Sequence, residues 1–124
     1  MPKKENVIVD KTELFADRIV NMYKYLLNKR ERNEAILKQV LRSGTSSGAN
    51  VAEGQYAQTK ADFLTKMNIA LKEANETKFW LNRLHKGEFL STKEFQSIIT
   101  DNEDIININI LVKITGTTKE NLRK

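Results

Sequence analysis

Residues 42–54 read RSGTSSGANVAEG, and two very different structures can be written for them. Their glycines, serines and asparagine are typical of a loop. However, the helical phase of the apolar residues upstream continues through Gly44, Gly48 and Ala52, which follow one another at intervals of four residues. This spacing places three small residues on one helix face, where another helix can approach closely. We therefore predict one unbroken helix over about residues 34–56.

Three more segments have apolar residues at helical spacing, and each is preceded by a short polar side chain and a carboxylate in capping-box order. These starts are Asp10-Lys11-Thr12-Glu13, Thr59-Lys60-Ala61-Asp62 and Ser91-Thr92-Lys93-Glu94. They predict helices over about residues 11–29, 60–86 and 92–115. Gly87 stands where a helix-terminating glycine is expected.

The last of these segments has a second interpretation. Between residues 105 and 114 it is rich in β-branched side chains, which also alternate as in a strand. A single strand in an otherwise helical chain has no pairing partner, so we expect a helix here as well.

The chain has 124 residues, one proline, five glycines and no cysteine. This length fits one domain, and four helices with short connections predict an all-α, antiparallel up-down-up-down four-helix bundle over residues 1–124, with flexible termini. The lack of cysteine excludes disulfides, zinc-thiolate sites and thiol nucleophiles. No apolar run is long enough for a secretory signal or a membrane span, so we expect a cytoplasmic protein with no membrane partner.

One catalytic motif is matched formally, because residues 44–48 fit the G-x-S-x-G nucleophile elbow with Ser46 at its centre. That motif requires a strand before the serine and a histidine base that reaches it, whereas the preceding residues are helical in phase and His85 is the single histidine of the chain. One histidine cannot build a metal site, and no Glu-x-x-His pattern or phosphate-binding loop is present. We therefore predict no catalytic residue, no metal and no cofactor.

The formal net charge is +5, which describes either an ordinary lysine-rich surface or a polyanion-binding one. Arg30, Arg32, Lys38 and Arg42 lie close together in the sequence. They are the candidates for contact with phosphates or with another partner.

A polar stripe follows one face of the predicted helix 34–56 and contains Arg42, Ser46, Asn50 and Glu53. It is either a solvated face or a polar contact with another subunit or partner. Combined with the small residues, it gives the candidates for helix packing or an interface, which are Gly44, Ser46, Gly48, Asn50, Ala52 and Glu53.

Residues 42–54 also resemble the signature of four-helix bundle proteins similar to those encoded in the intervening sequences of bacterial 23S ribosomal RNA genes. Residues 62–81, DFLTKMNIALKEANETKFWL, resemble the third helix of that family. The resemblance covers about residues 12–115. It implies an unbroken second helix and assembly into a ring, a homopentamer, and it supplies no catalytic residue. One relative, the accessory variability protein of diversity-generating retroelements, is similar to a basic barrel that binds nucleic acid and a reverse transcriptase.

Two functional hypotheses follow. The first is a non-catalytic homo-oligomeric bundle that binds RNA, DNA or a ribonucleoprotein partner. The alternative is a structural or protein-interaction scaffold without affinity for nucleic acid.

Overall fold

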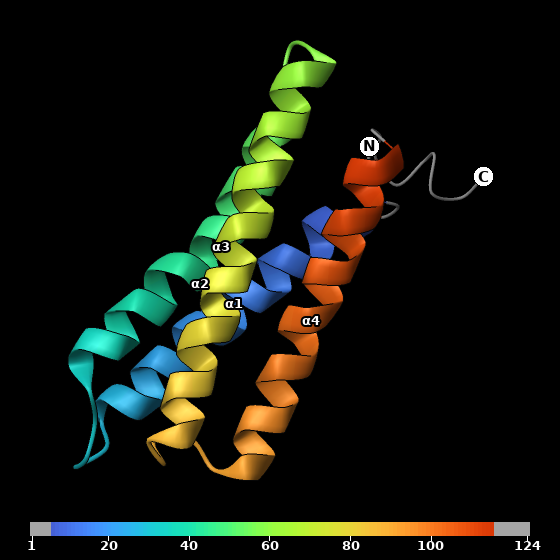
Figure 1. Ribbon diagram of the computed structural model, residues 1–124. Helices are drawn as coiled ribbons and strands as arrows, with labels where there is room; N and C mark the ends of the chain where they lie inside the picture. Colours follow the sequence, from blue (N-terminus) through green and yellow to red (C-terminus); the bar gives the residue numbers. More distant parts are fainter. Residues whose placement is uncertain (1–5, 116–124) are drawn as a thin grey trace.

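The computed structural model describes residues 6–115, and within this range all regular structure is helical. The four helices are α1 (Val7–Leu27), α2 (Glu34–Gly54), α3 (Lys60–Lys86) and α4 (Thr92–Thr115). Figure 1 shows the chain reversing its direction at each connection. The protein is thus an all-α four-helix bundle, as predicted. The predicted flexible termini fall largely on residues 1–5 and 116–124, which lie outside the described residues.

Helix α1 begins four residues before the predicted start, so the capping box expected at Asp10 is wrong. Ile8 is buried in the core, and burial of this side chain stabilises the additional turn. Asn6 precedes the helix without capping it, since its Oδ1 accepts no hydrogen bond, and its Nδ2 donates to Oε1 of Gln55 at 2.7 Å. Thr12, expected within the capping box, lies in the helix interior and donates its hydroxyl to the carbonyl oxygen of Ile8.

The other three helices begin at side chains that cap them. Asn33 Oδ1 accepts from the backbone N–H of Ile36 at 3.1 Å, and Thr59 Oγ1 accepts from that of Asp62 at 3.0 Å. Ahead of α4, Ser91 and Glu94 each accept from the backbone N–H of the other, which completes a capping box.

Helices α1 and α2 each end two residues before the predicted position. Just beyond both ends a backbone N–H bonds to the carbonyl oxygen three residues back, from Lys29 to Leu26 and from Gln55 to Ala52. Such bonds tighten the last turn and satisfy carbonyl groups that the helix leaves open. Helices α3 and α4 have the predicted bounds.

The core contains apolar side chains from all four helices, and at its centre are Phe15, Ile19, Val40, Val51, Met67, Leu81, Leu84 and Ile105. The segment 105–114 is helical, which confirms the prediction against a strand. Only part of its apolar surface is buried, because Leu111 and Ile114 are 51% and 75% exposed.

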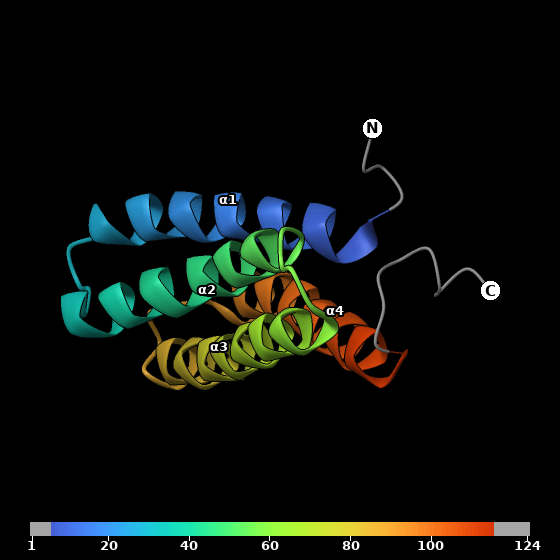
Figure 2. The same cartoon turned by 90° about the horizontal axis from the view of Figure 1, so that it is seen from above.

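Helix α2 is continuous through residues 42–54 and packs against both α1 and α3. Seen from above in Figure 2, it lies between these two helices. A Cβ atom on Gly48 would stand 3.1 Å from the carbonyl oxygen of Thr12, and one on Gly44 would stand 2.9 Å from Cγ1 of Ile19. The two glycines therefore set the close approach of α1. Contact between α1 and α4 is less extensive, and a cleft opens there.

Candidate nucleic-acid interface

The end of the bundle that carries the α1–α2 and α3–α4 connections is basic. We call it the loop end and define it as residues 24–34 and 83–94, at the bottom of Figure 1. Seven lysines and arginines are found there against four carboxylates. The basic residues are Lys24, Lys29, Arg30, Arg32, Arg83, Lys86 and Lys93. Within residues 6–115, the opposite end (residues 6–13, 53–66 and 107–115) has four basic and four acidic residues, so the loop end is the more basic of the two ends in the described part of the chain.

Two of the four predicted basic candidates belong to the loop end. Arg32 forms an ion pair with Glu34 at 3.1 Å and also donates to the carbonyl oxygen of Lys29. Arg30 is exposed, and the ion pairs within residues 6–115 do not include it. Its guanidinium group is therefore available to bind an anion.

The other two candidates lie on the side of α2. Arg42 is held between two carboxylates of α3, at 3.0 Å from Glu73 and in contact with Glu76. The hydrogen bond from Arg42 lowers the pKa of Glu76, and a second hydrogen bond from Trp80 Nε1 acts in the same direction. The charge of Arg42 is thus balanced within the chain, and its role is to join α2 to α3. Lys38 is exposed one turn earlier.

The predicted packing candidates divide between two contacts of α2. Gly44 and Gly48 face α1, and Ala52 lines a shallow groove on the same side. Glu53 reaches α3 through an ion pair with Lys66 at 2.6 Å. The polar stripe that begins at Arg42 therefore follows the α2/α3 boundary at both of its charged ends.

The two remaining stripe residues bond within α2. Asn50 Nδ2 donates to the carbonyl oxygen of Ser46 at 2.9 Å.

The segment around Ser46 is helical on both sides, so the strand that a nucleophile elbow requires is not there. His85 is remote from this position and stacks on Phe95 with ring centroids 4.3 Å apart. Across residues 6–115, no three potential metal ligands of the His, Cys, Asp or Glu type gather at one point.

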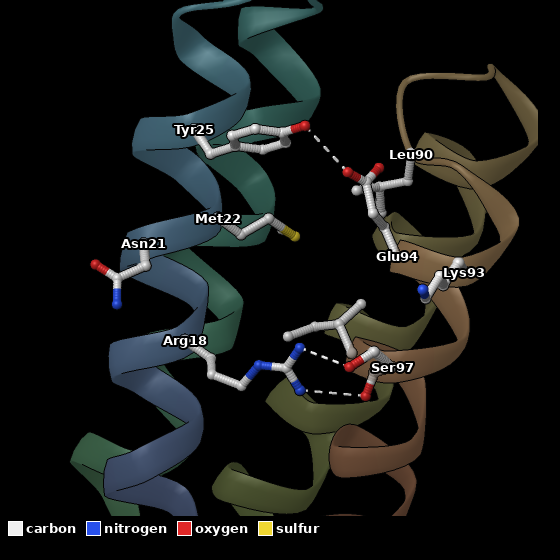
Figure 3. Close-up of a pocket in the computed structure, with 9 residues that line it drawn as sticks. Arg18, Asn21, Met22, Tyr25, Leu90, Lys93, Glu94 and Ser97 are labelled. Carbon is white, nitrogen blue, oxygen red and sulfur yellow. Dashed lines mark hydrogen bonds between the residues drawn. The ribbon is translucent and has the colours of Figure 1, made fainter.

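A cleft of about 530 Å³ separates α1 from α4 and reaches into the loop end. Figure 3 shows two polar bridges across it. Tyr25 donates its hydroxyl to Glu94 at 3.1 Å, and Arg18 donates to the Ser97 hydroxyl at 2.8 Å and to Asp101 at 2.7 Å. The space between the bridges is lined by apolar side chains, namely Met22, Leu90 and Ile98. The cleft thus combines an apolar floor with charged walls.

At the loop-end side of the cleft, contacts with Tyr25 and Ser91 hold the charged groups of Lys29 and Glu94. The Lys29 ammonium lies 4.8 Å from the centroid of the Tyr25 ring. The pKa of Glu94 is lowered, first by the backbone N–H of Ser91 and further by the Tyr25 hydroxyl and the nearby Lys29 charge. Glu94 is therefore a carboxylate at neutral pH. This site was not predicted from the sequence, although Tyr25 and Lys29 are four residues apart in the predicted helix and therefore lie on the same face.

Comparison with known protein families matches residues 4–110 to the family described as 23S rRNA-intervening sequence protein. The chain belongs to this family. The match covers most of the chain and includes α1, α2 and α3 completely.

Among solved structures, this member of the 23S rRNA-intervening sequence protein family is similar to a protein of unknown function from the S23 ribosomal protein family of Bacteroides thetaiotaomicron. The two chains are 46% identical, and the TM-score is 0.82 over 86% of this chain and 97% of the other. No curated protein matches the sequence. Within residues 6–115, no helix is both long enough and apolar enough to cross a membrane.

Proposed function

We propose that this protein is a non-catalytic homo-oligomer that binds nucleic acid, alone or within a ribonucleoprotein, through the loop end of the bundle. The basic loop end is the observation that carries the proposal. Phosphate groups attract exposed lysines and arginines whatever the base sequence, and the release of counterions drives such binding. At the loop end seven of these side chains stand against four carboxylates, whereas within residues 6–115 the opposite end has four of each.

Assembly into an oligomer adds to this attraction, because each copy contributes another basic end. Apolar side chains on the surface support self-association. Leu14 is 68% exposed on α1, and Ile114 and Leu111 are exposed on α4. Exposed apolar patches mark interaction sites in soluble proteins. Sedimentation should therefore give a multiple of the chain mass of 14.3 kDa, and a pentamer is the state that we propose.

The charge proposal is tested by the salt dependence of binding to a structured RNA and to a DNA duplex. We expect Arg30→Gln combined with Lys86→Gln to weaken binding and to reduce the slope of log K against log salt by about 2, since each lost phosphate contact removes about 1. The matched control is Lys60→Gln combined with Lys113→Gln, which removes the same charge from the opposite end. Equal effects of the two double variants, or no binding at low salt, would contradict the proposal.

The exposed apolar surface of α1 and α4 also favours a second candidate, a protein-interaction scaffold. It predicts a stable oligomer that does not bind either nucleic acid at low salt. The same titration therefore separates the two functions.

A further inference from the structure

The ring of Tyr25 offers one face to the α1/α4 cleft. The side chain is 51% exposed and lines the cleft. Lys29, one helical turn further along, lies over the ring. Met22 and Arg18, which precede Tyr25 in α1, lie together on one side of the ring in Figure 3. Because its hydroxyl is bonded to Glu94, the ring is anchored at its tip and keeps this orientation.

The residues that line the cleft around Tyr25 could bind a flat heterocycle that carries a phosphate group. The floor is apolar, and the volume of about 530 Å³ lies within the usual range for small-ligand sites. Lys29 and Lys93 place two ammonium groups at the loop-end side. The Glu94 carboxylate beside them has both oxygens engaged, one by Ser91 and one by Tyr25. Arg18 is likewise held by Ser97 and Asp101. The two lysines are therefore the cations left to meet a phosphate.

We infer that the α1/α4 cleft accepts one unstacked base of single-stranded RNA or DNA, which stacks on Tyr25 while its phosphates contact Lys29 and Lys93. This inference rests on the proposed function and names the nucleic-acid form that the loop end selects. Aromatic side chains next to cations are the usual elements of single-strand binding sites, because every base has a face that can stack. A base paired inside a duplex cannot enter the cleft.

The test uses the full chain and short single-stranded RNA and DNA oligonucleotides of one sequence, each with a single 2-aminopurine, whose fluorescence is quenched on stacking. We expect quenching on binding to the wild-type protein. Tyr25→Ala should remove the quenching and weaken binding about tenfold, as expected for the loss of one stacked base. Tyr25→Phe retains the stacking face and should keep both properties. A duplex of the same length should bind the wild type and Tyr25→Ala equally.

Phe79 provides a matched control. It is 50% exposed on α3 and also lies beneath a cation, with Arg83 at 5.1 Å from its ring centroid, but it does not line the cleft. Phe79→Ala should leave quenching and affinity unchanged. Circular dichroism and the thermal midpoint of each variant establish that it is folded.

The possible outcomes separate the two proposals. If single strands bind but Tyr25→Ala behaves as the wild type, the cleft inference is wrong and the charge proposal stands. If neither oligonucleotide binds at low salt, the proposed function fails and the cleft inference fails with it. If Tyr25→Ala dissociates the oligomer while single-strand affinity per chain is unchanged, the cleft is a subunit contact, which also overturns the inference.

Discussion

The two sides of α1 are built in opposite ways. On the side of α2, Gly44 and Gly48 bring the helices together until a backbone carbonyl and a buried isoleucine fill the space of the missing side chains. On the side of α4, Arg18 and Tyr25 span a gap with hydrogen bonds and leave a cleft. The close contact relies on shape and leaves only a shallow groove between the two helices. The open contact relies on long polar side chains at the surface, which contribute little stability, and this side of α1 is therefore the one that has room for function.

The largest effect is expected where a side chain would meet the backbone of α1. Gly48→Val should destabilise the protein by about 3 kcal/mol, because the Thr12 carbonyl cannot rotate away as a side chain could and α1 must move. The neighbouring Ala49→Val is the control, since residue 49 is exposed in the same helix, and it should cost less than about 1 kcal/mol. Urea unfolding at pH 7 measures both. Equal losses would mean that α1 does not depend on a close approach at Gly48.

A smaller effect is expected at Gly44, where the obstacle is a side chain. Gly44→Ala should cost about 1–2 kcal/mol, because the buried Ile19 must shift. In the double variant Gly44→Ala/Ile19→Val, the new methyl group takes part of the space that Ile19 gives up. We therefore expect the loss to be less than the sum of the two single variants, as a double-mutant cycle would report. Strict additivity would show that the two positions do not compete for space.

Substitution at the open contact should have a small effect. Arg18→Met removes the bridge to Ser97 and Asp101, and because these groups are exposed we expect a loss below about 1 kcal/mol. Oligonucleotide binding should be reduced only slightly, since the Arg18 charge is already paired. A loss as large as that of Gly48→Val would remove the contrast between the two sides of α1.

The pH dependence of the capping box at the start of α4 gives the finest test. The folded pKa of Glu94 lies below its usual value of about 4.3. Its contribution to stability is therefore complete above that value and is lost as the pH falls through the lower folded pKa. Glu94→Gln should cost up to about 1 kcal/mol at pH 7. Thermal unfolding should show this difference shrink below pH 4, whereas a constant difference would exclude a role for the charge.

The sequence predicted well the features that depend on neighbouring residues. The bounds of α3 and α4 follow from local caps at Thr59 and Ser91 and from Gly87, and the continuity of α2 follows from the interval between Gly44 and Gly48. The start of α1 was missed because it depends on the burial of Ile8 and on a contact between Asn6 and Gln55. These two residues are 49 positions apart, so no local pattern reports their contact.

The same limit explains the candidate site. Arg42 was grouped with Arg30 and Arg32 by sequence proximity, but its two carboxylate partners come from α3, 31 and 34 positions away. The cleft was not predicted because it arises from the relative position of α1 and α4, which meet only after the chain has reversed its direction three times between them. The basic loop end could have been predicted, since an up-down bundle brings residues 24–34 and 83–94 to the same end.

Hydrogen exchange of the full chain, with and without a saturating single-stranded RNA, tests most directly whether the open side of α1 is the functional one. Backbone amides exchange according to local opening, so a ligand that bridges two helices slows exchange in both. We expect new protection in α1 around Arg18–Tyr25 and in α4 around residues 90–98, with little change where α2 packs on α1. Protection confined to α2 and α3, with α1 and α4 unchanged, would contradict the division of roles between the two sides of α1.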